Sequence, residues 1–321
     1  MTTAVVTGAA GFVGSHLSEK LVGDGHDVIG IDSFSDFYPR ERKLANLSNL
    51  LGESRFRLAE GDLSTDDLSK YVRDADLLFH LAAQPGVRTS WGESFSVYLR
   101  DNILATQRLL EASKGSRLRR FVFASSSSVY GDAEKYPTGE SAPTRPNSPY
   151  GVTKLAAENL CRLYHRNFRV PVVVLRYFTV YGPRQRPDMG IYRFIDSLLR
   201  RKTITLYGDG KQSRDFTYVS DIVEGTALAA DAGVVGETIN LGGGRPTSII
   251  GLISMLEEIT GLECKVEHLP VQKGDVVRTS ADIRKARAKL RYRPKVSLDE
   301  GLKKQLEWQE SLEVNTRAGV P

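Results

Sequence analysis

The sequence contains few of the residues that build disulfide-rich scaffolds. Only two cysteines, Cys161 and Cys264, occur among its 321 residues, and they lack a C-x-x-C spacing. This count excludes a disulfide framework and argues against a thiolate metal site, and it favours a reducing compartment. We therefore expect a cytoplasmic protein that binds no metal.

Long hydrophobic runs are also missing. No apolar stretch approaches the ~20 residues that span a bilayer, and no basic segment or long apolar stretch precedes the apolar residues 4–6. We expect no membrane contact. The net charge is +5, but the basic clusters at 117–120, 200–202 and 284–293 lack the interleaved aromatic residues that stack bases. We expect no nucleic-acid partner, whereas a small anionic substrate remains compatible.

Apolar runs of strand length alternate with longer segments of helical periodicity in the first half of the chain. The expected strands are residues 4–7, 27–31, 56–58, 77–81, 120–125 and 171–176. The expected helices are residues 12–23, 63–72, 98–113 and 150–167. This alternation predicts an α/β fold, a Rossmann-type doubly wound parallel sheet with crossover helices.

The rhythm changes after Arg176, where loops lengthen, Gly and Pro become frequent and helices such as 249–259 stand apart. We assign residues 1–175 to the sheet domain and 176–321 mainly to a smaller C-terminal α/β domain for the substrate. A strand and helix near 216–241 are expected to return to the first domain. The tail after Ser311 has no apolar period, so we expect it to be frayed.

A glycine-rich turn follows the first expected strand and opens the first helix. Gly8, Gly11 and Gly14 recur at intervals of three, which permits a tight turn and a close approach of backbone to a pyrophosphate. Asp32, eighteen residues beyond Gly14, can bind the adenine ribose 2′-hydroxyl and favours NAD over NADP, although it could be a turn residue or a helix cap. Asp62 could reach the adenine or simply cap a helix.

A tyrosine and a lysine, Tyr150 and Lys154, lie four residues apart and therefore on one face of a helix that follows Pro149. Roughly one such pair is expected by chance, but its place after the fifth strand, whose end carries the hydroxyls of 125–128, favours catalysis. A phenol of pKa about 10 is a poor base, so we expect a nearby cation to lower its pKa. The serines alone could equally be caps.

These motifs resemble the extended short-chain dehydrogenase/reductase family, the NAD-dependent epimerases and dehydratases. The resemblance rests on the glycine turn, Val129-Tyr130-Gly131 and the Tyr150/Lys154 pair, and it continues through 214–219 and 274–276. It implies NAD as cofactor, Tyr150 as acid and base, Lys154 as its electrostatic and ribose-binding partner, and Ser126 as an aid to proton transfer. It also implies cofactor contacts for Phe12, Val13, Leu63, Leu81, Ala82 and Ala83.

The two positions after Ser126 bear on the reaction. Dehydratases of the family carry an Asp-Glu pair there and decarboxylases carry a Glu in the second place, whereas this chain has Ser127 and Ser128. Without an acid to drive elimination, epimerisation at C4′ is the simplest outcome. The segment 175–189, with Thr179 and Arg186, is most similar to that of UDP-glucuronate 4-epimerases, although Arg186 alone could be a surface residue.

Oxidation of glucuronate at C4′ gives a β-keto acid, which loses CO2 when the bond to the carboxylate lies perpendicular to the ketone. We hypothesise that Ser127, Ser128, Thr179 and Arg186 hold this carboxylate near the ketone plane. At the nucleotide end, Arg214 and Arg278 are the best candidates for a diphosphate clamp, because a forked guanidinium suits phosphate oxygens. Tyr192 and Gln212 are weaker candidates for substrate binding.

The sequence thus favours an NAD-dependent UDP-glucuronate 4-epimerase and leaves three alternatives. Two are a UDP-glucose/galactose 4-epimerase and a UDP-glucuronate decarboxylase of the same family. The third is a catalytically silent NAD-sensing protein, which usually lacks the Tyr/Lys pair found here. The resemblance also implies a homodimer through the helices at 98–113 and 150–167.

Overall fold

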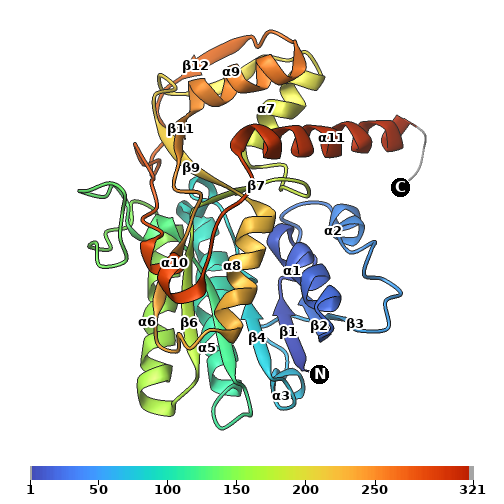
Figure 1. Ribbon diagram of the computed structural model, residues 1–321, viewed down its shortest axis with the longest axis vertical. Coiled ribbons are helices and arrows are strands. Elements are labelled where there is room, and N and C mark those ends of the chain that lie inside the picture. The colour runs from blue at the N-terminus through green and yellow to red at the C-terminus, as the bar shows by residue number, and fades with distance from the viewer. Residues whose placement is uncertain (1, 318–321) are drawn as a thin grey trace.

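A seven-stranded parallel sheet forms the centre of the computed structural model, which describes residues 2–317 (Figure 1). Its strands are β1 (Thr3–Thr7), β2 (Asp27–Asp32), β3 (Phe56–Glu60), β4 (Leu77–His80), β5 (Arg120–Ser126), β6 (Val172–Tyr177) and β10 (Thr238–Leu241). Their order across the sheet is β10-β6-β5-β4-β1-β2-β3, and every pairing is parallel. The predicted Rossmann-type doubly wound sheet is confirmed.

Helices cover both faces of this sheet because its strands are apolar on both sides. One face carries α1 (Phe12–Gly23) and α8 (Val219–Asp231), and the other carries α3 (Ser69–Val72), α5 (Ala105–Ala112) and α6 (Pro149–Phe168). Along β1, Ala4 and Val6 join the hydrophobic cluster of α1 and α8, whereas Val5 joins the cluster of α3, α5 and α6. All three residues are fully buried.

The direction of chain progression reverses beside β1, which pairs with β2 on one side and β4 on the other. From β1 the chain adds β2 and β3 toward one edge of the sheet, and from β4 it adds β5, β6 and β10 toward the other edge. Between the two sets of connections a crevice opens at the carboxyl ends of the strands. The glycine-rich turn after β1 lies at this point.

The second half of the chain builds the upper part of Figure 1 around two small sheets. One contains β7 (Thr179–Tyr181), β9 (Ser213–Tyr218) and β11 (Pro246–Ser248), and the other pairs β8 (Ile204–Tyr207) with β12 (Val266–Leu269). The helices here are α7 (Gly190–Leu199), α9 (Ile249–Thr260) and α11 (Leu298–Arg317), while α10 (Arg284–Leu290) packs beside β10.

The fully buried Asp215 at the start of β9 ties distant segments together. Its carboxylate accepts hydrogen bonds from the backbone N–H groups of Gly243, Gly244 and Ala281 at 2.8, 3.1 and 2.7 Å. Three backbone donors satisfy a carboxylate that burial would otherwise destabilise.

Two predicted helices differ from the observed ones. Of residues 63–72 only α3 (Ser69–Val72) is helical, because Asp62 and Asp67 accept hydrogen bonds from the backbone two residues on and hold turns instead. The helix expected at 98–113 begins earlier, as α4 (Phe95–Tyr98), and continues into α5 through a wider π-helical segment, Leu99–Leu104.

The expected fraying after Ser311 is wrong as far as Arg317, because α11 continues to that residue. Before Ser311 this helix is docked through polar contacts of two buried glutamines, Gln305 and Gln309. Gln305 accepts from the backbone N–H of Gly182 at 2.8 Å, and Gln309 donates to the backbone carbonyl of Tyr192 at 3.2 Å. Residues 318–321 of the expected tail lie outside the described residues.

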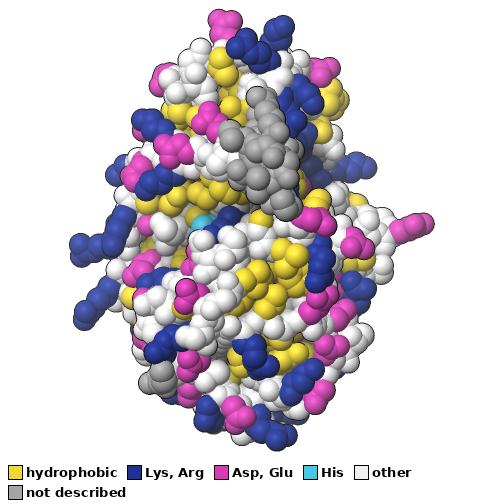
Figure 2. All heavy atoms as spheres, turned by 90° about the vertical axis from the view of Figure 1, so that its right-hand side faces the viewer, with side chains coloured by type: hydrophobic (Ala, Val, Ile, Leu, Met, Phe, Trp, Pro, Cys, Tyr) yellow, Lys and Arg dark blue, Asp and Glu magenta, His cyan; other side chains and the backbone are white. Residues whose placement is uncertain are grey.

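No helix among residues 2–317 is both long enough and apolar enough to span a membrane. The same residues contain no group of three or more His, Cys, Asp or Glu side chains arranged to hold a metal ion. On the face drawn in Figure 2, Lys and Arg side chains are interspersed with Asp and Glu.

Candidate active site

A cavity of about 410 Å³ opens at the carboxyl ends of β1, β2, β4, β5 and β6, where the fold places a ligand crevice. Most of the residues predicted for the site line this one cavity. They are Gly8, Gly11, Phe12, Val13, Gly14, Asp32, Asp62, Leu63, Leu81, Ala82, Ala83, Ser126, Ser127, Ser128, Tyr150, Lys154, Thr179 and Arg186.

The glycine turn is so tight that side chains would not fit. Gly8 has a φ of +70°, and a Cβ on Gly14 would lie 2.0 Å from the Gly8 carbonyl oxygen. Gly11 is the N-cap of α1 and has no side chain to cover the first N–H groups of the helix. These donors and the helix dipole suit a pyrophosphate, so the turn fits a dinucleotide.

Asp32 closes the adenosine end of the cavity. Its carboxylate accepts hydrogen bonds from the backbone N–H groups of Ala10 at 3.0 Å and Phe34 at 2.9 Å. Lys43 from α2 (Arg40–Asn46) lies 3.8 Å from the same carboxylate and also lines the cavity. Nothing in the sequence marks Lys43 as part of the site, because the loop at 33–39 has no periodic pattern that would place α2 against β2.

Tyr150 and Lys154 lie in the first turns of α6, which Ser148 caps by accepting the N–H of Gly151 at 3.2 Å. Burial raises the pKa of Tyr150, while a hydrogen bond with Ser126 and the charge of Arg186 act in the opposite direction. In its protein surroundings the phenol pKa is therefore above its ordinary value, and the lowering expected from Lys154 together with the positive nicotinamide stays a prediction. Desolvation outweighs the two opposing effects.

Lys154 is only 3% exposed, and its amine lies 4.5 Å from the centre of the Phe123 ring. Burial lowers its pKa from 10.5 to about 8. Burial therefore destabilises the charged form of this lysine, which lies one helical turn from the tyrosine on the same helix.

A buried polar network fixes the serine-rich end of β5 beneath the cavity. Ser125 donates to Glu158 at 2.5 Å, and Glu158 pairs with Arg176 at 2.7 Å. Arg176 donates to the hydroxyl of Tyr130 at 2.9 Å, and that hydroxyl donates to Asn240 at 2.7 Å. The network links β5, α6, β6 and β10, and Tyr130 of the Val-Tyr-Gly segment is part of it.

Asn102, in the π-helical segment, is a positioning residue that the sequence analysis missed. Its amide donates to the Thr153 hydroxyl at 3.0 Å, and its oxygen accepts the backbone N–H of Gln84 at 2.7 Å. It therefore joins α6, which carries the Tyr/Lys pair, to the cavity wall after β4. An asparagine within a helical period gives no sign of this role, because the wider turn that aims it is a local departure from the α-helix.

The guanidinium of Arg186 belongs to a residue that also lines the cavity. It forms two 3.0 Å contacts with the carboxylate of Asp188 and lies 5.7 Å from the centre of the Phe37 ring. The loop that carries it is tied to α1, since His16 contacts the Pro183 carbonyl at 3.0 Å and Arg184 pairs with Glu19 at 2.6 Å.

Comparison with known proteins agrees with this geometry. Residues 4–242 match the model of the NAD dependent epimerase/dehydratase family. The chain belongs to the NAD-dependent epimerase/dehydratase family. Its cofactor is NAD, and the glycine turn, Asp32 and Tyr150 are arranged to fit that group.

Relatives of this epimerase/dehydratase match it over nearly its whole length. The uncharacterized UDP-glucose epimerase YtcB of Bacillus subtilis is 48% identical over 96% of this chain and 98% of its own. The UDP-glucuronate 4-epimerase of Thermodesulfobacterium geofontis is 40% identical over 95% of each. A crystal structure of the UDP-glucuronic acid 4-epimerase of Bacillus cereus, in complex with UDP-glucuronic acid and NAD, is 47% identical, with a TM-score of 0.95 over 97% of this chain and 99% of that one.

Two arginines predicted for the nucleotide end of this epimerase/dehydratase lie outside the cavity lining but beside each other, because Ser213 and Arg278 form a backbone bridge. Arg214 donates to the Ser213 carbonyl at 3.0 Å, and Arg278 lies 5.0 Å from the centre of the Tyr136 ring. Burial lowers the pKa of Arg214. Gln212 is near them and donates to the Tyr207 carbonyl at 2.8 Å.

Arg88 joins this group, although the sequence analysis did not single it out. It lies 4.2 Å from the centre of the Tyr207 ring and pairs with Asp275 at 2.7 Å. Since it is 187 residues from Asp275 in the chain, only the fold brings the two together.

Tyr192 has a different place from the one expected. It does not line the cavity as the structure describes it, and its buried ring packs against Trp308 at 6.1 Å between centroids. The guanidinium of Arg42 covers the ring at 5.2 Å. This side chain fastens α11 and α2 to α7, so its contacts are structural.

Proposed function

We propose that this protein is a UDP-glucuronate 4-epimerase, which interconverts UDP-glucuronate and UDP-galacturonate through a transient 4-keto sugar. The observation that carries the proposal is the cavity wall beside the tyrosine, which presents the hydroxyls of Ser126, Ser127, Ser128 and Thr179 and the guanidinium of Arg186. An acid that would drive elimination is absent from both positions after Ser126.

Tyr150 is the acid and base of this reaction. As a phenolate it accepts the proton of O4′, and as the resulting phenol it later returns this proton, with Ser126 as the hydrogen-bonding neighbour that assists the transfer. NAD, when bound, takes the hydride from C4′, adds positive charge beside the phenol and gives the hydride back to the opposite face. Lys154 contributes its charge from the same helix and binds the nicotinamide ribose.

The carboxylate of the sugar is the group that the protein must restrain. Arg186 and the hydroxyls of Ser127, Ser128 and Thr179 hold it near the plane of the C4′ ketone by charge-assisted hydrogen bonds. In that orientation the bond to the carboxylate is poorly aligned for loss of CO2, so the keto intermediate survives until it has turned over.

The nucleotide end of the substrate binds in the second half of the chain. Arg214 and Arg278 clamp the diphosphate, and Gln212 contributes a weaker contact, so that the keto sugar pivots about a fixed anchor. In this arrangement residues 1–175 bind NAD and residues 176–321 mainly bind the nucleotide sugar.

One experiment separates the candidate activities. Purified protein is incubated with UDP-glucuronate and, separately, with UDP-glucose, and the products are resolved by NMR. UDP-galacturonate is expected from the first substrate. UDP-galactose alone would instead support the UDP-glucose epimerase that the 48% identical YtcB name suggests, and a UDP-pentose would identify a decarboxylase.

We infer that two copies of the chain associate through the π-helical segment Leu99–Leu104, α5 and α6. This face exposes large hydrophobic side chains, with Leu99, Leu104, Val152 and Leu163 between 42% and 54% exposed. Light scattering is expected to give the mass of two chains, and Leu163→Glu to reduce it toward one. A single-chain mass for the unaltered protein would refute the dimer. We also place the protein in the cytoplasm, in keeping with its two free cysteines.

A further inference from the structure

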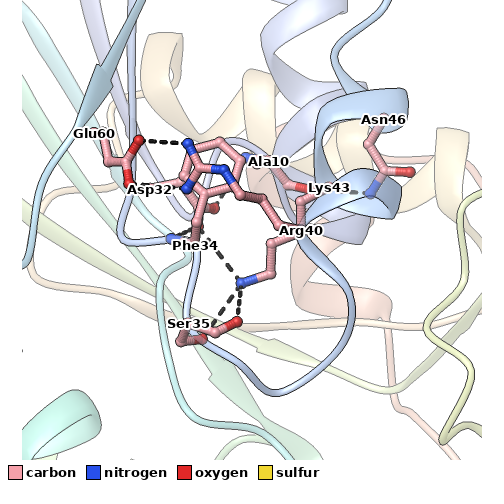
Figure 3. A network of polar contacts seen from close by, with 8 residues as sticks. All are labelled: Ala10, Asp32, Phe34, Ser35, Arg40, Lys43, Asn46 and Glu60. Carbon is pink, nitrogen blue, oxygen red and sulfur yellow. Dashed lines mark hydrogen bonds and ion pairs between the residues drawn. The ribbon is translucent and has the colours of Figure 1, made fainter. Parts of the chain in front are cut away.

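Two carboxylates lie side by side at the adenosine end of the sheet, and each faces a cation from one short helix (Figure 3). Asp32 and Glu60 are register partners at the ends of β2 and β3. Arg40 and Lys43 come from the first turn of α2, three residues apart and hence on neighbouring positions of one face. The four charges sum to zero.

The inner pair lies within the cofactor cavity. Asp32 and Lys43 are 8% and 5% exposed, and both line the cavity. The Lys43 amine donates to the Ser35 carbonyl at 2.8 Å and lies 3.8 Å from Asp32. The charge of Asp32 is therefore partly neutralised by Lys43. For this reason Asp32 repels a 2′-phosphate on the adenosine ribose less strongly than a carboxylate without a nearby cation would.

The outer pair is more exposed and outside the cavity lining. Arg40 donates to both oxygens of Glu60, at 2.8 and 2.6 Å, so Glu60 occupies its forked guanidinium. The guanidinium also lies 4.2 Å from the centre of the Phe34 ring, and the backbone N–H of Phe34 donates to Asp32. Arg40 is thus close to the ribose site but committed to Glu60.

We propose that Glu60 is a specificity-determining residue for the cofactor: by engaging Arg40 it withholds from the ribose site the second cation that a 2′-phosphate would require. A 2′-phosphate adds nearly two negative charges, and arginine is the side chain that commonly receives it in this fold. Without the charge of Glu60, Arg40 and Lys43 face the 2′-position together, and the preference for NAD over NADP weakens.

The test is a direct competition between the two dinucleotides. Protein freed of nucleotide is incubated with equal concentrations of NAD and NADP, desalted and denatured, and the released NAD and NADP are separated and quantified. Glu60→Gln is expected to raise the bound NADP/NAD ratio about fivefold, the scale of an exposed ion pair. The rise is expected to shrink at high salt. Glu53→Gln, an exposed acid before β3, is the matched control and leaves the ratio unchanged.

A second variant distinguishes release of Arg40 from simple loss of a repelling charge. When Arg40→Gln is already present, adding Glu60→Gln is expected to leave the bound NADP/NAD ratio unchanged, because no arginine remains to be released. An unchanged ratio in Glu60→Gln would overturn the proposal, and so would a gain that persists in the double variant. Neither result depends on which sugar nucleotide the enzyme converts.

Discussion

Arg176 and Glu158 form a two-pronged ion pair inside the protein, with Nε and Nη2 of the arginine 2.9 and 2.7 Å from the two carboxylate oxygens. Neither side chain is more than 3% exposed. Arg176→Met would leave the buried carboxylate with only the Ser125 hydroxyl and the half-exposed Arg162 as partners, so we expect the free energy of unfolding to fall by about 3 kcal/mol. Urea denaturation measures the loss.

The matched control for this prediction is Lys303→Met. Lys303 pairs with Asp299 at 2.7 Å, but both side chains are about half exposed. Its removal is expected to cost less than ~1 kcal/mol. Equal losses in the two variants would show that burial does not set the strength of the Arg176 contact.

Tyr150→Phe removes the proposed acid and base while keeping the ring that packs edge-on against Tyr98 at 6.3 Å. We expect kcat to fall by about 10²–10⁴-fold, the usual contribution of a positioned proton-transfer group, while NAD remains bound. Tyr164→Phe, on the same helix, should leave kcat unaltered, since its hydroxyl contacts Glu111 and Gln107 instead. Turnover of Tyr150→Phe at the native rate would remove the assignment.

The pKa of Lys154 predicts a pH dependence of stability. Burial lowers this pKa to about 8 from 10.5, so between these values the unfolded chain binds more protons at this site than the folded one. The free energy of unfolding therefore rises with pH through this window, by roughly 3 kcal/mol in total. Urea titrations from pH 7.5 to 10.5 should show this rise in the native protein and lack it in Lys154→Met. The opposite effect of the raised Tyr150 pKa is common to both proteins. Parallel profiles would contradict the prediction.

Arg186→Ala and Thr179→Val test the restraint of the sugar carboxylate. We expect Arg186→Ala to raise KM for UDP-glucuronate about 10–100-fold, the effect of losing a charge-assisted contact, and to release some UDP-pentose. Binding of UDP, which lacks the sugar carboxylate, serves as the internal control. The hypothesis fails if both variants epimerise normally and still form no pentose product.

Two glycines of α1 provide a contrast within one helix. A Cβ at Gly14 would meet the Gly8 carbonyl oxygen at 2.0 Å, whereas a Cβ at Gly23 would meet nothing within 4 Å. Gly14→Ala is expected to distort the turn and weaken NAD binding by at least about tenfold. Gly23→Ala should bind NAD normally and gain up to ~1 kcal/mol of stability. Calorimetric titration with NAD and thermal denaturation decide both, and normal NAD affinity in Gly14→Ala would contradict the steric argument.

The sheet and the cavity residues near it could be predicted because their signals are local. The runs around Val5 and Val173 are apolar on both strand faces, and Gly8 and Gly14 mark the turn that joins β1 to α1. In a parallel sheet the carboxyl ends of the strands meet at one edge, so Asp32 and Ser126 could be brought together without knowing a single side-chain contact.

The rest depends on contacts that no sequence period encodes. Gln305 docks α11 through hydrogen bonds, although a glutamine in the sequence resembles a surface residue. Asn102 is oriented by a widened helical turn. Lys43 enters the cavity only because α2 folds back over β2 after an irregular loop. Tyr192 packs against Trp308, which the sequence could not indicate, because an aromatic residue in an amphipathic helix can face either a ligand or the core.

The three N–H groups that satisfy Asp215 come from Gly243, Gly244 and Ala281. During synthesis the last of these donors emerges 66 residues after the carboxylate that needs it. Strand β10, which completes the central sheet beside β6, also emerges more than sixty residues after that neighbour. The central sheet therefore cannot be completed before residue 241 has been synthesised, and a chain stopped near residue 242 would expose the unsatisfied carboxylate of Asp215 to chaperones and proteases.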